Sequence, residues 1–336
     1  MSAMWRVLRR RWWVWVAAGL VLSLLIGSGV LYAKTGLYGF NVMFRRGKTT
    51  WSQTGPDDPH LSRGVRLALG NPVPAATAGP LSWREAAPGF EVGELPVLAA
   101  GGEVDRILLT RIDPAHYRFK VLSRPAGDRE IGDWMNATDA VLAVNGSYFA
   151  YNGTPDTPVL TDGRLRGPRD YTATHGAFVA NGKVPSASLI DLTGTTWPAA
   201  FAGADNGLVS YPMLIDAEGR SRAAHTAADQ LANRSFLGQD SRGRIVIGTT
   251  KDAFFSLGRL ADFLIAAPLD LKLALNLDGG PVACQAVRLP GTTRDFCGTW
   301  ETARHDGKLE VLGSLFGSRR AGLPLVIAAF PQNERD

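Results

Sequence analysis

An uncharged apolar segment near the start of the chain restricts the possible folds more than any other feature. It runs from residue 12 to residue 33, WWVWVAAGLVLSLLIGSGVLYA. As a helix, its 22 residues would cross a hydrocarbon core of about 30 Å. Aromatic residues stand at both ends, as is typical of membrane interfaces. We therefore expect a single transmembrane anchor at 12–33, preceded by a basic cytoplasmic tail at 1–11.

A cleaved signal peptide is the alternative interpretation of this segment. The apolar part of a signal peptide is usually about 7–15 residues long, and Leu31-Tyr32-Ala33 is a poor cleavage site. These two features favour an uncleaved anchor. Basic residues flank the segment on both sides, so the positive-inside bias is weak. The large domain that follows favours a cytoplasmic N-terminus and a periplasmic or extracellular C-terminal domain.

The net charge of +5 is carried by the region around the apolar segment. Residues 1–48 contain eight Lys or Arg and no Asp or Glu, which leaves 28 basic against 31 acidic residues over 49–336. The rest of the chain is therefore slightly acidic. This distribution argues against a nucleic-acid partner, which would require a basic globular surface.

The chain has two cysteines, Cys284 and Cys297. A disulfide between them would close a short loop, and an extracytoplasmic location favours that bridge. Two free buried thiols are the alternative.

After the apolar segment, the pattern divides the chain into a lead-in and one large domain. Residues 34–80, rich in Pro, Gly, Ser and Thr from about residue 47, are expected to form a linker or loosely packed lead-in. From residue 81 to 332, short apolar runs alternate with turn residues, which indicates strands joined by hairpins. One of these predicted strands is GLVSYPMLID, residues 207–216.

One segment has clear helical spacing. In SLGRLADFLIAA, residues 256–267, Ser256 is the expected N-cap and Pro268 the expected stop. The predicted apolar stripe consists of Leu257, Leu260, Ala261, Leu264 and Ile265. Strands with few helices and no regular strand–helix alternation predict an α+β fold of strand-rich mixed sheets, preceded by the transmembrane helix.

Common cofactor motifs are absent from the sequence. It contains no G-x-G-x-x-G after a strand, no P-loop and no H-E-x-x-H, and its five histidines lack ligand spacing. We therefore expect no cofactor; a divalent metal held by Asp278 and its neighbours remains an alternative without support from ligand spacing.

Three strand ends carry polar residues instead. Asn145, Gly146 and Ser147 end the run AVLAVNGS; Arg234 and Ser235 precede a predicted hairpin; and Asn276, Asp278, Gly279 and Gly280 end LKLALNLDGG. Because side chains alternate along a strand, Asn276 and Asp278 are expected on the face opposite Leu275 and Leu277. Each element also has a simpler explanation as a turn or a surface ion pair.

Together and in this order, the three elements resemble the phosphodiester glycosidase domain family. The family's Asn-Gly-Gly-Phe-Phe stretch is matched by Asn145–Phe149, with Ser147 and Tyr148 in place of Gly and Phe. Its Arg-Thr-Ala-Ile-Gly stretch is matched by Arg234–Gly238. Its Asn-Leu-Asp-Gly-Gly-Gly-Ser stretch is matched by Asn276–Val282, with Pro281 and Val282 in place of Gly and Ser. The resemblance covers about residues 81–332.

The resemblance implies hydrolysis of a sugar-1-phosphodiester in envelope or exopolysaccharide glycan metabolism. It implies a catalytic group of Asp278, Arg234 and Asn145. The expected substrate-binding residues are Asn276, Gly279, Gly280, Ser147, Gly146, Ser235 and His175. Arg234 would bind the phosphate, Asp278 would stabilise an oxocarbenium-like transition state, and the amides of Gly279 and Gly280 would approach the anion.

The sequence leaves open the second carboxylate and a non-catalytic function. Glycosidases ordinarily use two carboxylates, and the candidates for the second, Asp205 and Asp240, both have the context of turn residues. The alternative function is a non-catalytic glycan-binding or polysaccharide-assembly protein, which the Pro281–Val282 departure favours.

Overall fold

The computed structural model describes residues 12–30, 49–150, 152–181, 186–223, 228–314 and 320–332. The chain divides into two compact units, one of Met1–Thr54 with Glu310–Arg319 and one of Gly55–Leu309 with Arg320–Asp336. The expected basic tail at 1–11, residues 31–33 of the expected anchor and residues 34–48 of the expected linker lie outside the described residues.

The smaller unit contains an apolar helix and a strand pair. The helix, Trp12–Val30, has 19 residues and a mean hydropathy of 2.0. It is long and apolar enough to cross a membrane, a property that anchors and signal sequences share. β1 (Thr49–Gln53) pairs antiparallel with the residues of β20 (Lys308–Ser314) from Glu310 onward.

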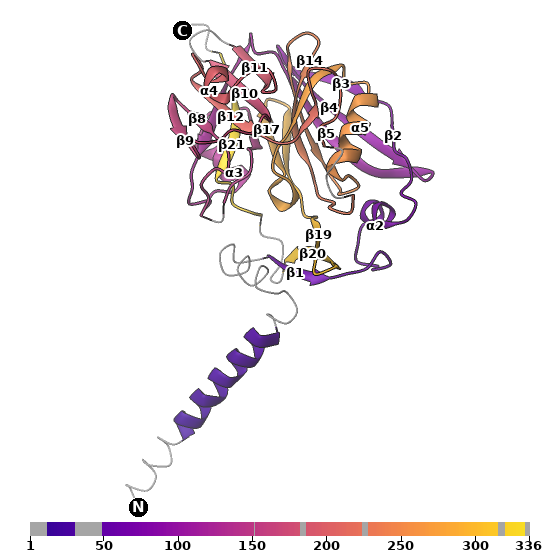
Figure 1. Ribbon diagram of the computed structural model, residues 1–336, viewed down its shortest axis with the longest axis vertical. Coiled ribbons are helices and arrows are strands. Elements are labelled where there is room, and N and C mark those ends of the chain that lie inside the picture. The colour runs from indigo at the N-terminus through magenta and orange to yellow at the C-terminus, as the bar shows by residue number, and fades with distance from the viewer. Residues whose placement is uncertain are drawn as a thin grey trace, which may run out of the picture. The chain divides into compact units, whose positions relative to one another are not determined.

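The larger unit is a strand-rich α+β fold, as predicted. Figure 1 shows its strands gathered into layered sheets, with short helices at the periphery. The helices are α2 (Arg63–Leu69), α3 (Ile131–Asn136), α4 (Trp197–Ala200), α5 (Leu257–Ala266) and the 3-10 helix η1 (Gly280–Val282). The segment 55–80, expected as a loosely packed lead-in, includes α2, whose Val65 and Ala68 are buried.

Three antiparallel sheets form the body of this unit. The eight-stranded sheet has the order β13-β16-β14-β15-β5-β4-β2, with β3 paired to β4. Its strands are β2 (Thr77–Ala78), β3 (Ser82–Ala87), β4 (Phe90–Ala99), β5 (Gly102–Ile112), β13 (Met213–Ile215), β14 (Ser235–Asp240), β15 (Ile245–Thr250) and β16 (Leu271–Asn276).

The two other sheets have five strands each. The order β18-β17-β7-β21-β6 joins β6 (Tyr117–Ser123), β7 (Leu142–Asn145), β17 (Cys284–Leu289), β18 (Thr292–Cys297) and β21 (Leu325–Pro331). The order β11-β10-β12-β8-β9 joins β8 (Val159–Thr161), β9 (Arg164–Arg166), β10 (Gly176–Asn181), β11 (Ser186–Asp191) and β12 (Asn206–Ser210). A further strand, β19, spans Thr302–His305.

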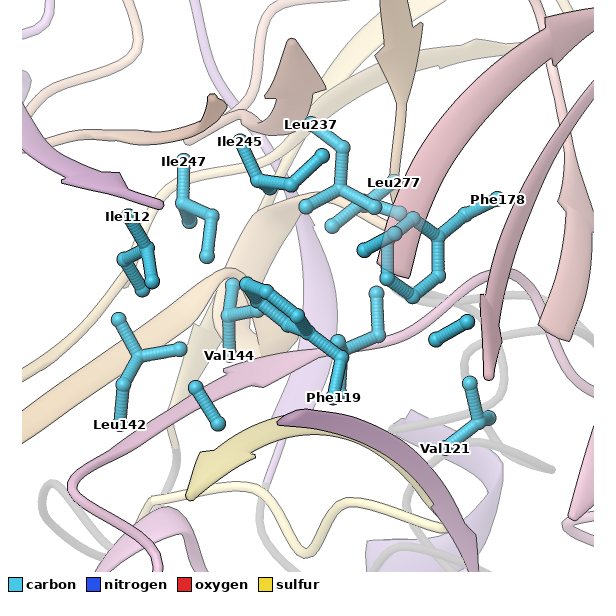
Figure 2. Close-up of a cluster of buried hydrophobic side chains, with 14 of the residues drawn as sticks. Ile112, Phe119, Val121, Leu142, Val144, Phe178, Leu237, Ile245, Ile247 and Leu277 are labelled. Carbon is cyan, nitrogen blue, oxygen red and sulfur yellow. The ribbon is translucent and has the colours of Figure 1, made fainter. Parts of the chain in front are cut away.

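The main hydrophobic core lies where these three sheets face one another. Figure 2 shows Ile247 of β15, Val144 of β7 and Phe178 of β10 converging in it. Leu275 and Leu277 are fully buried in the same cluster. The apolar face of β16 therefore holds the strand in the core, as the alternating leucines predict, and brings its C-terminal end to a fixed place.

Two sequence predictions need correction in detail. GLVSYPMLID forms two strands, β12 and β13, in different sheets. The break falls at Tyr211-Pro212, since proline has no N–H to continue the ladder. α5 begins after the expected N-cap Ser256, but its buried face includes Phe263, whereas Ile265 is 47% exposed.

The predicted disulfide joins the neighbouring strands β17 and β18, where Cys284 and Cys297 lie directly opposite each other. A bridge that closes a short loop restricts the conformations of the unfolded chain and so stabilises the folded one. We expect the double variant Cys284→Ala, Cys297→Ala to lower the free energy of unfolding by about 3 kcal/mol, measured by urea titration under non-reducing conditions. Equal stability with and without the bridge would contradict this expectation.

A buried carboxyl on β5 predicts a pH-dependent stability. Asp105 is 4% exposed and accepts backbone hydrogen bonds from Arg106 (2.6 Å), Asp252 (2.8 Å) and Phe254 (3.4 Å). Burial raises the pKa of Asp105 well above its ordinary value, and the nearby charge of Asp252 adds to the effect. The folded-state pKa thus exceeds the unfolded value, so the contribution of this carboxyl to stability is complete below about pH 3.9. It is lost as the pH rises towards the folded-state pKa.

Replacement of Asp105 with asparagine removes this titration while the side-chain oxygen keeps its two shorter bonds. We expect the free energy of unfolding of Asp105→Asn, relative to wild type, to rise from about pH 4 to 8, by about 1.4 kcal/mol for each pKa unit of displacement. The exposed Asp139→Asn is the matched control. If the difference in free energy of unfolding between Asp105→Asn and wild type does not change with pH, the raised pKa assigned to Asp105 is refuted.

Candidate functional site

The loops after β7 and β16 are clamped together by reciprocal hydrogen bonds. The backbone N–H of Asp278 donates to the carbonyl of Gly146 (3.1 Å), and Asn145 Nδ2 donates to the carbonyl of Asp278 (2.8 Å). Asn145 Oδ1 accepts from the N–H of Cys284 (3.1 Å). The Asn145 amide and the Gly146 carbonyl thus hold the backbone carbonyl and the backbone N–H of Asp278, respectively.

Arg234 enters the same place from the start of β14, which pairs with β16. Its side chain is 5% exposed, and it donates to the carbonyls of Gln230 (Nη2, 2.6 Å) and Phe255 (Nε, 3.4 Å). Burial lowers the pKa of Arg234, and the charges of Glu301 and Asp278 oppose that shift. Guanidinium remains protonated in proteins, so the site contains a fixed cation.

These residues line a cavity of about 350 Å³, within the range of small-molecule sites. Its lining consists of Tyr148, His175, Tyr211, Pro212, Gln230, Ala232, Arg234, Leu257, Asp278, Gly279 and Glu301. Of the residues predicted from sequence, the structure brings Asp278, Arg234, Gly279 and His175 to this cavity. A cation and two carboxylates in one pocket suit a substrate with both an anionic group and a carbon that develops positive charge.

Glu301 is the functional candidate that the sequence did not indicate. After β18 the chain returns beside Arg234, where Ala232 and Glu301 form an isolated β-bridge and the N–H of Asn233 donates to the carbonyl of Trp300 (3.0 Å). The two carboxylates proposed from sequence lie outside the cavity lining. Asp240 is bonded to Arg244 (2.7 Å), and the backbone of Asp205 is bonded to that of Ala180 (3.1 Å).

Aromatic rings form one wall of the cavity. Tyr211 stacks on Tyr148 with ring centroids 4.5 Å apart and on His175 at 4.8 Å. The Tyr171 hydroxyl is hydrogen-bonded to His175 Nδ1. Burial lowers the pKa of His175, helped by the charge of Arg222, which favours a neutral imidazole at pH 7. Tyr211 reaches the wall because Pro212 breaks the predicted long strand at this point.

The comparisons with known proteins find a family resemblance in this region. Residues 138–295 match the phosphodiester glycosidase family model. Over these residues the chain resembles that family. The match includes Asn145, His175, Arg234 and Asp278, and Glu301 follows six residues after its end.

Solved structures resemble this chain at low sequence identity. The catalytic domain of zebrafish N-acetylglucosamine-1-phosphodiester alpha-N-acetylglucosaminidase, auto-inhibited by its pro-peptide, is 13% identical with a TM-score of 0.48, covering 86% of this chain and 93% of that one. A Synechocystis protein is 17% identical with a TM-score of 0.45 (76% and 64% covered). A Burkholderia pseudomallei K96243 protein is 10% identical with a TM-score of 0.45 (84% and 99% covered). No curated protein matched the sequence.

The backbone amides of Gly279 and Gly280 have partners other than the expected substrate anion. The N–H of Gly279 donates to the Asp278 carboxylate (2.8 Å), and the N–H of Gly280 donates to the carbonyl of Asn233 (2.8 Å). The glycines instead provide space. A Cβ on Gly279 would lie 2.9 Å from Asn233 O, and one on Gly280, where φ is +68°, would lie 2.4 Å from Glu301 Oε2.

The remaining predicted substrate-binding residues lie outside the cavity lining. Gly146 packs so closely on Leu325 that a Cβ would lie 2.5 Å from Leu325 Cγ. Ser147 and Ser235 are buried and bonded to Ser210 (2.9 Å) and Thr249 (3.2 Å), respectively. Asn276, expected on the open face, is fully buried. These residues support the site from within and do not face the cavity.

Within the described part of the chain, the acidic group closest to a metal-binding arrangement is Asp191, Asp216 and Glu218. Arg222 already bonds to Asp191 and places Nε 3.9 Å from Asp216 Oδ2. None of the three acidic residues lines the cavity. Arg222 therefore already forms ion pairs within this acidic group.

Proposed function

We propose that this protein is a membrane-anchored, extracytoplasmic phosphodiester glycosidase that hydrolyses a sugar-1-phosphodiester in envelope or exopolysaccharide glycan metabolism. The observation that supports it is the placement of Arg234, Asp278 and Glu301 around one cavity within a domain of this family. The apolar helix and the disulfide support the location. We propose that the reaction needs no cofactor.

In the proposed reaction, water attacks the anomeric carbon and the bond from that carbon to the phosphate oxygen breaks. The oxygen stays with phosphorus, so the products are a free sugar and a phosphomonoester. Arg234 binds the phosphate oxygens, and its Nη1 is directed towards Gly279, where a Cβ would lie 3.4 Å away. Asp278 stabilises the positive charge that develops on the sugar ring.

Glu301 is the proposed second carboxylate. It replaces Asp205 and Asp240 in that role, because it lines the cavity that Asp278 lines. Its role is to accept the proton of the attacking water or to shield the opposite face of the sugar. Asn145 is a positioning residue, since its amide is bonded to the backbone of Asp278 and Cys284.

The non-catalytic alternative rested on Pro281 and Val282. These residues form η1, and Val282 is 3% exposed in a second hydrophobic cluster with Ile131 and Trp134. Neither lines the cavity. The departure from the family motif therefore lies outside the cavity lining, which supports the catalytic proposal.

The proposal is tested with the full chain in detergent and a panel of sugar-1-phosphodiesters, beginning with α-GlcNAc-1-phospho-methyl mannoside. We expect release of free sugar from at least one member and no cleavage of bis(p-nitrophenyl) phosphate, which has no glycosyl group. Binding of panel members without release of sugar would favour a glycan-binding protein. Cleavage of bis(p-nitrophenyl) phosphate at a comparable rate would indicate a general phosphodiesterase.

A further inference from the structure

The hydroxyl of Tyr148 is one polar group of the cavity that the reaction above does not use. Tyr148 lies three residues beyond the end of β7 and lines the cavity with Arg234 and Asp278. The family motif has phenylalanine at this position, so the hydroxyl is an addition of this chain. Its ring is held in a stack on Tyr211.

The hydrogen bonds of Asn276 fix the direction of the Tyr148 proton. Asn276 Nδ2 donates to the backbone carbonyl of Tyr211 (3.1 Å), which can only accept, so the amide orientation is defined. The same Nδ2 lies 2.6 Å from Tyr148 Oη, which therefore accepts. The Tyr148 proton must therefore be donated to a group other than Asn276.

The surroundings keep this hydroxyl protonated. Burial raises the pKa of Tyr148, and the negative charge of Asp278 raises it further. The carboxylate of Asp278 repels an anion, whereas the neutral hydroxyl and the guanidinium of Arg234 attract one. Tyr148 and Arg234, which line the same cavity, therefore both favour a phosphate group there.

We propose that Tyr148 donates a hydrogen bond to a phosphate oxygen of the substrate and, with Arg234, makes the site selective for glycosyl phosphodiesters over glycosides with uncharged leaving groups. This inference rests on the proposed function for its substrate class. Binding of the phosphate group can be measured separately from hydrolysis of the substrate.

Tyr148→Phe is the matched variant, since it removes one oxygen and keeps the ring stack. The probe is the methyl ester of a C-glycosyl methylphosphonate, in which CH2 replaces the anomeric oxygen, prepared with each sugar of the panel. Binding to the full chain in detergent is measured by calorimetry. A hydrogen bond to a charged group contributes about 1.5–3 kcal/mol, so we expect Kd to rise about 10–150-fold. Affinity for the free sugar is expected to stay unchanged.

Tyr117→Phe, in the hydrophobic core, is the control for loss of a buried hydroxyl, and melting temperatures verify that each variant is folded. Equal phosphonate affinity of wild type and Tyr148→Phe would overturn the inference, as would a wild type that binds no phosphonate. A tenfold or greater loss of phosphonate affinity in Tyr148→Phe, in a protein that hydrolyses no diester, would uphold the binding role while refuting the proposed function.

Discussion

Asp278→Asn is expected to reduce kcat/KM for a sugar-1-phosphodiester by about 10²–10⁴-fold, the range for removing a positioned acid, base or charge from an active site. The expected loss of activity comes from the removed charge and not from a disturbed loop. The asparagine oxygen can still accept from the N–H of Gly279, and the backbone clamp of Asn145 and Gly146 does not involve the carboxylate. The change therefore removes the negative charge beside the sugar and leaves the loop in place.

Initial rates for wild type and Asp278→Asn, at equal amounts of folded protein, provide the measurement. Affinity for the phosphonate is expected to be retained or improved in the variant, because a carboxylate that repels the phosphate is lost. A variant with wild-type kcat/KM would show that Asp278 has no part in the chemistry.

Glu301→Gln is the second change for which we expect a large effect, about 10²–10⁴-fold in kcat/KM. Glu301 and Asp278 line one cavity and both act on the charge of Arg234. If Glu301 activates the attacking water, azide should restore turnover in the variant and yield a glycosyl azide. The anomeric configuration of that azide then reports which face of the sugar Glu301 occupies.

Asp205→Asn is the control for Glu301→Gln, since it alters a carboxylate outside the cavity lining. We expect its kcat/KM to equal that of wild type. Full activity in Glu301→Gln together with loss of activity in Asp205→Asn would reverse the assignment of the second carboxylate.

The sequence was informative about the candidate site residues that lie at the ends of strands. Leu275 and Leu277 bury one face of β16, so Asp278 has to emerge at its tip, and the pairing of β14 with β16 brings Arg234 beside it. The place of Asp278 follows from alternation along its strand, whereas that of Arg234 depends on the pairing of two strands distant in sequence. The α5 helix was predictable from the helical spacing of its apolar residues.

What the sequence could not predict depends on long-range packing. Glu301 reaches the cavity because β17 and β18 form a hairpin, closed by the disulfide, and the chain then passes beside Ala232. No spacing in the sequence marks that return. The partners of Asn145 and of the two glycine amides also come from elements distant in sequence, so their positioning roles were visible only in the structure.

The central claim is that bond cleavage occurs at the anomeric carbon and not at phosphorus. Hydrolysis of the active sugar-1-phosphodiester in H₂¹⁸O, followed by mass spectrometry of the phosphomonoester, tests it directly, because phosphate oxygens do not exchange with water under these conditions. A glycosidase with Arg234 on the phosphate and Asp278 at the sugar predicts a phosphomonoester free of ¹⁸O. Incorporation of one ¹⁸O into the phosphomonoester would place the attack at phosphorus and contradict the account.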